Sequence, residues 1–207
     1  MALDLEQQYY QQGYKSIVGT DEAGRGCLLG PVFAAAVILP VGFSSPLIND
    51  SKKLTAKQRE LAYQIIVENA LAYAITSIDA DTIDEVNILN ASRLAMKQAI
   101  DQLNRPFDLV LTDCMKIQGY SVPVIDIIHG DALSINIAAA SILAKVSRDH
   151  WCEQIDPQYP LYHIKKNKGY GTKDHLEALK EYGPVPHLHR YSYAPVRACL
   201  IEKVELV

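Results

Sequence analysis

Residues 17–40 constrain the fold most, because they hold two apolar runs joined by a short glycine-rich link. The first run, IVGT, meets two carboxylates and then AGRG, and the second run, VFAAAVIL, is closed by Pro40. Apolar runs of this length that are bounded by Gly and Pro are typical of buried strands. We therefore predict that the chain begins with a hairpin of two strands.

Segments with helical spacing alternate with short apolar runs along the next part of the chain. Apolar residues recur every three or four positions at residues 54–69 and 87–103, and an alanine-rich stretch follows at 134–153, which predicts three helices. Three further strands are predicted, at residues 72–78, 108–113 and 122–128. Strands that alternate with helices are typical of an α/β fold built on one sheet.

The composition changes after Asp156-Pro157 to a segment rich in Pro, Tyr, Lys and Gly, with one short helix predicted near residues 174–182. A chain of 207 residues, about half of them apolar, can bury a substantial core. We expect residues 1–207 to form a single domain, in which residues from about 156 to 207 form a small helical C-terminal subdomain.

Charge and cysteine content limit the partners and the compartment. The formal net charge of −4 gives no general attraction to phosphate, so a nucleic-acid surface would need local clusters of Lys and Arg. The four cysteines lack the spacing of a zinc site or a disulfide framework, which predicts reduced thiols. Residues 1–16 lack the pattern of a signal peptide and no apolar stretch reaches membrane-spanning length, so we expect a cytoplasmic protein.

Carboxylates follow the predicted strands where three of these strands end: Asp21 and Glu22, Asp113, and Asp131. In open α/β sheets the functional crevice lies at the carboxyl ends of the strands. Carboxylates that converge there repel one another and are costly to desolvate unless a cation neutralises them. The pattern therefore predicts a site for magnesium, although a single Asp after a strand more commonly forms a turn.

Neighbouring strand residues point to opposite faces of a sheet, which is a difficulty for a site that uses both Asp21 and Glu22. Both side chains can serve one centre only if the chain bends, and Ala23-Gly24 can supply the bend. The segment lacks the spacing of a phosphate-binding loop. The alternatives for GRG are a plain hairpin turn, or a backbone that approaches a substrate closely with Arg25 available for phosphate.

A basic segment, HIKKNKGYGTKDH, occupies residues 163–175. Its lysines are Lys165, Lys166, Lys168 and Lys173. Such lysines are commonly the solvated side chains of a surface loop. In the functional interpretation they contact phosphate while Tyr170 stacks on a sugar or base. An acidic metal site beside a basic segment is what phosphodiester hydrolysis requires.

Taken in order, these motifs resemble the ribonuclease HII family over nearly the whole chain. The motifs are VGTDEAGRG with LLGPV behind it, NDSKKL at residues 49–54, ILNASRLAMKQAI, the strand that ends at Asp113, GDALSINIAAASILAKVSRD, KGYGT, and His189-Arg190. Several separate motifs in one order are more specific than any single motif. The resemblance implies a ribonuclease H-like mixed five-stranded sheet flanked by helices, with a small helical C-terminal subdomain.

The resemblance also implies roles for residues of this chain. The implied catalytic residues, which also bind the metal, are Asp21, Glu22, Asp113 and Asp131. The implied substrate-binding residues are Gly24, Arg25, Gly26, Tyr170, Lys53 and Lys168. Among these, the GRG turn would read the 2′-hydroxyl and the adjacent backbone, and the tyrosine would pack on the ribonucleotide sugar.

The implied activity is hydrolysis of the RNA strand of RNA–DNA hybrids and incision 5′ to ribonucleotides embedded in duplex DNA. Two Mg²⁺ or Mn²⁺ ions would be used, and the products would carry a 5′-phosphate and a 3′-hydroxyl. Removal of misincorporated ribonucleotides and primer remnants follows as the expected cellular role. The family resemblance implies a monomer.

Three other protein classes share part of the pattern. A junction-resolving nuclease of the same broad fold would share the carboxylates without needing GRG and KGYGT together. A non-catalytic nucleic-acid-binding domain would not need all four carboxylates. The sister family, ribonuclease HIII, carries an N-terminal binding domain, for which we expect no room before Ile17.

Some positions depart from the family pattern or invite a second interpretation. Cys27 stands where proline is expected after GRG, Cys114 follows Asp113 where glycine is usual, and Asn136-Ile137 precedes the alanines. These departures leave the metal ligands intact and affect the fine positioning of substrate. Asp149, four residues after Lys145, is expected to form a structural ion pair within the long helix.

Overall fold

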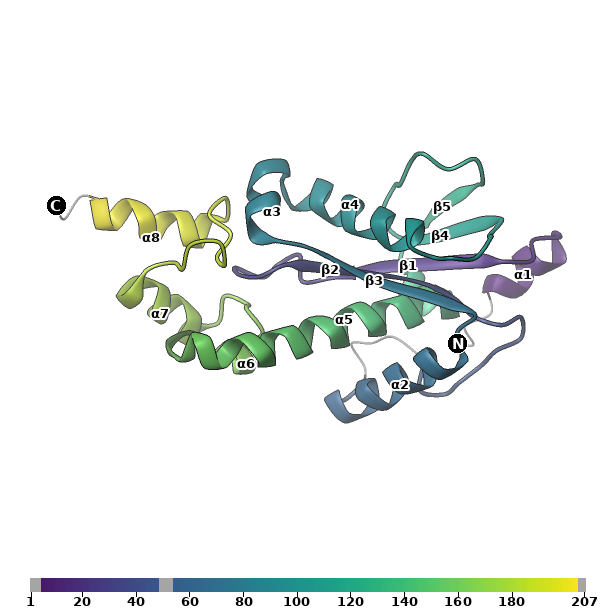
Figure 1. Cartoon of the computed structure of the whole chain (residues 1–207), viewed down its shortest axis with the longest axis horizontal. Helices are drawn as coiled ribbons and strands as arrows, with labels where there is room; N and C mark the ends of the chain where they lie inside the picture. The colour runs from purple at the N-terminus through teal and green to yellow at the C-terminus, as the bar shows by residue number, and fades with distance from the viewer. Residues whose placement is uncertain (1–4, 49–53, 205–207) are drawn as a thin grey trace.

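The computed structural model describes residues 5–48 and 54–204, with side chains described as far as residue 200. Its centre is one five-stranded sheet with the strand order β3-β2-β1-β4-β5 (Figure 1). The strands are β1 (Ile17–Ala23), β2 (Val32–Ile38), β3 (Ala72–Ile78), β4 (Leu109–Asp113) and β5 (Val124–Ile127). β1 pairs antiparallel with β2 and parallel with β4, and β5 is parallel to β4. The predicted hairpin and the predicted mixed five-stranded sheet are confirmed.

Helices cover both faces of the sheet, with α3 and α4 on one face and α5 and α2 on the other (Figure 1). The α-helices are α1 (Leu5–Gln11), α2 (Ala56–Asn69), α3 (Ala80–Val86), α4 (Ile88–Asp101), α5 (Ile135–Ile155), α6 (Ile164–Asn167), α7 (Lys173–Tyr182) and α8 (Ala194–Val204). Short 3-10 helices lie at η2 (Gly130–Ala132), η3 (Asp156–Gln158) and η4 (Pro160–Tyr162). Among the described residues, no helix is both long and apolar enough to span a membrane.

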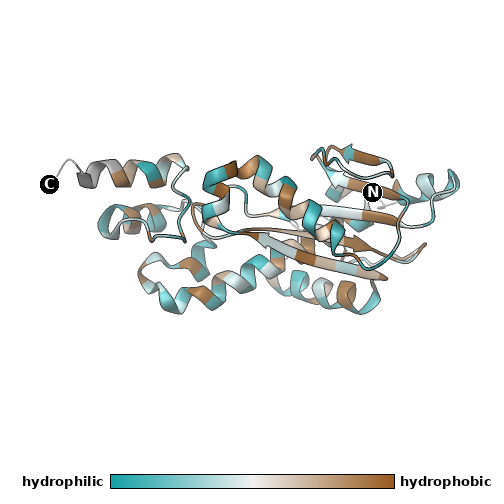
Figure 2. Cartoon of the chain, turned by 45° about the horizontal axis from the view of Figure 1, so that its top comes forward, coloured by the Kyte–Doolittle hydropathy of each residue, from teal (hydrophilic) through white to brown (hydrophobic). Residues whose placement is uncertain are grey.

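Alternating side chains of β2 supply the core on each face of the sheet. Ala34 and Ala36 pack towards α4, whereas Ala35 and Val37 pack towards α5. The strands are accordingly hydrophobic along most of their length, while the helices alternate between hydrophobic and hydrophilic positions (Figure 2). Small residues let α5 lie close to the sheet, and at Gly19 a Cβ atom would overlap the backbone of Asn136. This close approach fixes α5 over the strand that carries the first two predicted carboxylates.

The C-terminal part, residues 156–204, packs on the link between β1 and β2 and on the last turns of α5. Leu28 and Leu29 of the link form one apolar cluster with Cys152, Ile164 and Leu179. Backbone hydrogen bonds join the same parts, since the Leu28 N–H donates to the Gly169 carbonyl (2.8 Å) and the Gly30 N–H donates to the Leu188 carbonyl (2.8 Å). The C-terminal part therefore shares its core with the β1–β2 link.

Candidate active site

A cavity of about 330 Å³ lies at the carboxyl ends of β1 and β4. It is lined by Asp21, Glu22, Ala23, Gly24, Arg25, Gly26, Arg59, Asp113, Ser141, Lys145 and Tyr170. These residues come from separate parts of the chain, and the parallel pairing of β1 with β4 places Thr20 beside Thr112, one residue before each carboxylate-bearing position. The cavity thus brings together three of the four predicted metal ligands, the GRG turn and Tyr170.

Asp21 and Glu22 line the same cavity although they are neighbours on one strand. The strand ends at Ala23, and the chain turns at Gly24, whose φ of +100° is a left-handed conformation that glycine adopts without strain. The Glu22 N–H donates a hydrogen bond to Asp21 Oδ1 (2.7 Å). The bend predicted at Ala23-Gly24 is therefore present.

The Asp21 carboxyl is electrostatically destabilised in its charged form. Burial is the main reason that its pKa lies well above the usual value, and the nearby Glu22 and Asp113 carboxylates raise the pKa further. Burial also raises the pKa of Glu22, against the opposing effect of Arg25. Glu22 Oε2 is buried and, among the described residues, has no hydrogen-bond partner. A buried cluster of oxygen donors with unsatisfied capacity is the chemistry that suits a hard divalent cation.

Two of these carboxylates are turned to other partners. Arg25 Nη1 donates to Glu22 Oε1 (3.3 Å), and the Gly130 N–H donates to Asp113 Oδ1 (2.8 Å). Within the described part of the chain, no three His, Cys, Asp or Glu side chains are grouped so that together they could hold a metal ion. The donor set fits Mg²⁺ or Mn²⁺ in chemistry, with one oxygen each of Glu22 and Asp113 held by these partners.

Asp131 lies outside the cavity lining. It is in η2 directly after Gly130, whose N–H binds the Asp113 carboxylate, and only 4% of its surface is exposed. Asp131 therefore lies close to Asp113 but does not itself line the cavity.

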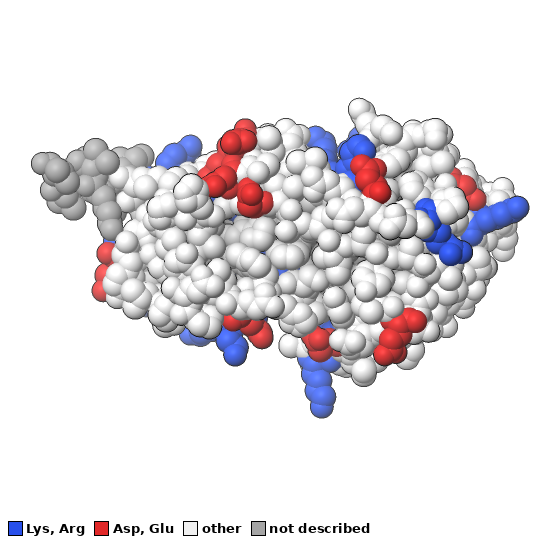
Figure 3. Space-filling view, viewed as in Figure 1, with Lys and Arg blue, Asp and Glu red and all other residues white. Residues whose placement is uncertain are grey.

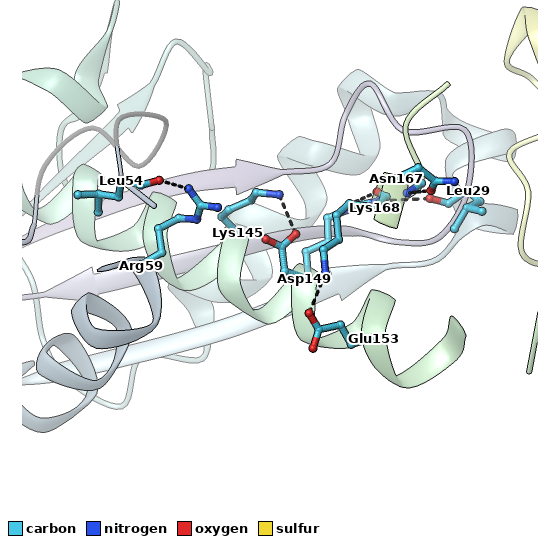
Figure 4. A network of polar contacts seen from close by, with 10 residues as sticks. Leu29, Leu54, Arg59, Lys145, Asp149, Glu153, Asn167 and Lys168 are labelled. Atoms are coloured by element: carbon cyan, nitrogen blue, oxygen red, sulfur yellow. Dashed lines mark hydrogen bonds and ion pairs between the residues drawn. The ribbon is translucent and has the colours of Figure 1, made fainter. Parts of the chain in front are cut away.

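Two cations that were not predicted to line the site, Arg59 of α2 and Lys145 of α5, also line the cavity. Both also line an adjoining hollow of about 340 Å³ between α2 and α5, which extends to Lys168 (Figure 4). Lys145 Nζ lies 2.7 Å from Asp149 Oδ1, which confirms the predicted ion pair within α5. Lys168 lies 2.9 Å from Glu153 and does not line the cavity that holds the carboxylates.

The basic segment is largely neutralised by its neighbours. Lys166 pairs with Asp174, Lys168 with Glu153, and Lys173 with Glu177. The face seen in Figure 3 likewise carries acidic and basic side chains in small mixed groups. None of these three lysines lines the cavity that holds the carboxylates, whereas Tyr170 of the same segment does. Lys53, the remaining predicted contact, lies outside the described residues.

Two buried arginines, Arg148 and Arg190, hold the loops around the cavity. Arg190 donates to the carbonyls of Gly24 (2.8 Å), Arg25 (3.1 Å) and Gly30 (2.9 Å). Arg148 donates to the Lys168 carbonyl (2.7 Å), and its guanidinium lies 5.9 Å from the centre of the Tyr170 ring. Both arginines belong to motifs that carry the family resemblance, but the sequence alone does not show that their side chains are buried.

Within the C-terminal part, two buried histidines connect Val185 to Tyr170. The Val185 N–H donates to Nδ1 of His189 (2.9 Å), and the Nε2 atoms of His189 and His175 lie 3.2 Å apart. Nδ1 of His175 lies 2.9 Å from the Tyr170 carbonyl. All three contacts are satisfied when both rings are neutral, His189 donates from Nε2 and His175 donates from Nδ1. Burial, followed by the neighbouring His175, lowers the pKa of His189 to about 3, so this neutral arrangement persists at physiological pH.

This histidine pair is expected to destabilise the protein in acid. An unfolded histidine titrates near 6.5, so between about 6.5 and 3 the unfolded chain binds more protons than the folded chain. The free energy of unfolding should therefore fall as the pH drops through this range, by about 1.4 kcal/mol per pH unit. Urea unfolding at several pH values checks the slope. In His189→Asn, whose side-chain oxygen can still accept from the Val185 N–H, the free energy of unfolding should change less steeply with pH. An equal slope would show that another group causes the pH dependence.

Comparison with known proteins agrees with this fold. A family model described as Ribonuclease HII matches residues 18–196. The ribonuclease HII of Desulfitobacterium hafniense (strain DSM 10664 / DCB-2) is 51% identical over 192 residues, which cover 93% of this chain and 74% of the relative. The ribonuclease HII of Acholeplasma laidlawii (strain PG-8A) is 50% identical over 198 residues, which cover 96% of each chain.

Solved structures share the fold. The ribonuclease H2 of Pyrococcus horikoshii OT3 superposes with a TM-score of 0.78 at 24% sequence identity, over 90% of this chain and 98% of that chain. A Bst ribonuclease HIII in complex with Mn²⁺ superposes with a TM-score of 0.67 at 16% identity, over 93% and 71%. The family match excludes a junction-resolving nuclease and a non-catalytic binding domain. The chain therefore belongs to the ribonuclease HII family and is an enzyme of the ribonuclease H type.

Proposed function

We propose that this enzyme hydrolyses the RNA strand of RNA–DNA hybrids and incises 5′ to single ribonucleotides in duplex DNA, leaving a 5′-phosphate and a 3′-hydroxyl. The observation that carries the proposal is one cavity lined by Asp21, Glu22 and Asp113 together with the GRG turn and Tyr170. Removal of misincorporated ribonucleotides and primer remnants is the cellular role that this specificity would serve. The proposed working unit is a monomer, as the family resemblance implies.

The proposed metal ligands are Asp21, Glu22, Asp113 and Asp131, and the proposed metal is Mg²⁺ or Mn²⁺. The buried, unpartnered Glu22 Oε2 and the raised pKa of Asp21 support a cation among these carboxylates. The Mn²⁺ in the Bst ribonuclease HIII structure supports a divalent metal for this fold. Two bound ions would supply an activated water and stabilisation of the leaving oxygen.

The other residues of the cavity would bind and orient the substrate. At Gly26 the backbone is open to a sugar, since an added Cβ would meet nothing nearer than the Tyr170 ring at 3.8 Å. At Gly24 an added Cβ would overlap the buried Arg148 side chain, so this glycine lets the turn pack on that arginine. Arg25 and Lys145 border the carboxylates and can bind phosphate oxygens. Tyr170, with 42% of its surface exposed, presents its ring to a sugar.

The deciding assay is cleavage of a DNA duplex that contains one ribonucleotide, beside an otherwise identical all-DNA duplex, in Mg²⁺ or Mn²⁺. We expect a single nick at the 5′ side of the ribonucleotide and no nick in the control, because only the first duplex offers a 2′-hydroxyl. Equal cutting of both duplexes, or no cutting with either metal, would refute the proposed function.

Replacement of Tyr170 is expected to reduce selectivity more than metal affinity. In Tyr170→Ala the ring that would pack on the sugar is lost, so selectivity for the ribonucleotide should fall about tenfold, which corresponds to a contact of about 1.4 kcal/mol. Because the all-DNA duplex is expected to stay uncut, kcat/KM for the ribonucleotide duplex measures this loss. Tyr170→Phe, which keeps the ring, is the control, and a change in the metal concentration at half-maximal activity would show that Tyr170 has been misplaced.

A further inference from the structure

A second hollow, which we call the α4 groove, lies between α4 and the segment that follows β4, and its volume is about 360 Å³. It is lined by Arg93, Leu94, Lys97, Lys116, Ile117 and Gln118. Three of these six residues are cationic and, among the described residues, no carboxylate lines the groove. The groove therefore offers donors to an anion without an acidic side chain to compete.

The three cations differ in how far their charge is already compensated. Lys97 is paired with Asp101 (2.7 Å). Arg93 donates from Nη1 to the neutral Asn90 side chain (3.3 Å), while its Nε is buried and has no hydrogen-bond partner in the described part of the chain. Lys116 is exposed and makes no ion pair with any described residue. Two positive charges in the groove are thus available to a ligand.

The α4 groove lies close to the carboxylates along the chain. Lys116 is three residues after Asp113, and the Thr112 hydroxyl donates to the Met115 carbonyl (2.6 Å), which folds this segment back towards β4. Three residues span at most about 11 Å. Each strand of a duplex carries a phosphate about every 3.4 Å along the axis. A duplex held at Asp113 would therefore present several phosphates within reach of Lys116.

We propose that the α4 groove is a phosphate-binding subsite that holds the backbone of the nucleic-acid duplex beside the cut site, through Arg93 and Lys116. This proposal rests on the proposed function, because it requires a duplex in the cavity. A phosphodiester accepts hydrogen bonds and carries one negative charge, and Arg93 and Lys116 supply donors and positive charge. The subsite would compensate for a chain that is acidic overall, with a formal net charge of −4.

The test is the salt dependence of binding to a hybrid of about 20 base pairs, measured without divalent metal by fluorescence anisotropy. Each phosphate contact contributes about 0.9 to the slope of log K against log salt, so Arg93→Ala/Lys116→Ala should lower the slope by about 2. At about 0.1 M salt its dissociation constant should rise roughly 60-fold relative to the unaltered enzyme, with the two proteins binding equally at about 1 M salt. KM should rise in the cleavage assay while kcat stays unchanged, because the groove does not line the carboxylate cavity.

The matched control is Lys15→Ala/Arg105→Ala, which removes the same charge from exposed positions just before β1 and β4, at the opposite ends of these strands. Its salt slope should equal that of the unaltered enzyme. Arg93→Lys/Lys116→Arg, which keeps both charges, should keep the slope and confirm that charge is the cause. Thermal unfolding of each variant verifies that it is folded.

The outcomes separate this proposal from the proposed function. If the unaltered enzyme binds and cuts the hybrid but Arg93→Ala/Lys116→Ala has the same slope, the α4 groove is only a solvated surface. An equal decrease of the salt slope in Arg93→Ala/Lys116→Ala and in Lys15→Ala/Arg105→Ala also overturns the subsite, because the effect then reflects net charge alone. If the unaltered enzyme neither binds nor cuts the hybrid, the proposed function itself is wrong.

Discussion

Asp21→Asn is expected to reduce the kcat of hybrid cleavage by at least about a thousandfold, equivalent to about 4 kcal/mol of lost transition-state stabilisation. Asp21 is buried at the centre of the carboxylates, beside Glu22 and Asp113. An amide oxygen keeps the size of the group but removes the charge that would hold a divalent cation. Initial rates on an RNA–DNA hybrid in Mg²⁺, with the metal concentration varied, measure the loss.

The same substitution should stabilise the protein in the absence of divalent metal. The pKa of Asp21 is higher in the folded protein than in the unfolded chain, so the folded state binds more protons between these two values. The free energy of unfolding therefore falls as the pH rises from about 3.9 through the raised pKa. Asn carries no charge to desolvate, and Asp21→Asn should therefore have the higher melting temperature at neutral pH.

Asp126→Asn is the matched control, because Asp126 is an exposed carboxylate on β5 that does not line the cavity. It should retain the kcat of the unaltered enzyme. Full activity of Asp21→Asn would remove this residue from the proposed metal site. Loss of activity together with a lower melting temperature would mean that the carboxyl group supports the fold instead.

Gly19→Ala is expected to lower the free energy of unfolding by more than about 4 kcal/mol, which leaves little or no folded protein. Gly19 lies in β1 directly beneath the first turn of α5, where an added Cβ would overlap backbone atoms of Asn136 and Ile137. Backbone atoms cannot rotate away as a flexible side chain can, so the helix itself would have to move.

The first turn of α5 is anchored so that this movement is costly. Asn136 Oδ1 accepts the Leu39 N–H (2.8 Å), and the Asn136 N–H donates to the buried Glu6 carboxylate (3.0 Å). Urea unfolding compares Gly19→Ala with Gly26→Ala, where the added Cβ has its nearest neighbour at 3.8 Å. Gly26→Ala should leave the unfolding midpoint nearly unchanged. Similar midpoints for both variants would show that α5 can shift away from the sheet.

The strands were predictable from sequence because each is a short apolar run with a clear end. The carboxylates at the ends of β1 and β4 followed from the same pattern, and parallel pairing makes them neighbours. Helices α1 and α3 were not predicted, since each has only seven residues and shows little periodicity in so short a span. In the C-terminal part, α7 was predicted and α8 was not.

The supports of the site were harder to predict than the carboxylates. Arg148 lies in a helix whose sequence gives no sign of which side faces the cavity, and Arg190 reaches carbonyl groups 160 or more positions earlier in the chain. Pairing of Lys166, Lys168 and Lys173 with acidic residues likewise depends on the folded chain. Local patterns therefore identified candidate ligands, whereas tertiary packing determined what holds the surrounding loops.

The joining of the β1–β2 link to the C-terminal part limits how this enzyme can be recombined. The link carries the GRG turn, and its backbone is bonded to residues 169 and 188–190 on either side. Arg190 adds its own hydrogen bonds to the same turn. A chimera that exchanges the C-terminal part with a relative must therefore exchange residues 24–30 as well. The two segments are hydrogen-bonded to each other, so each must match the other for the GRG turn to keep its position.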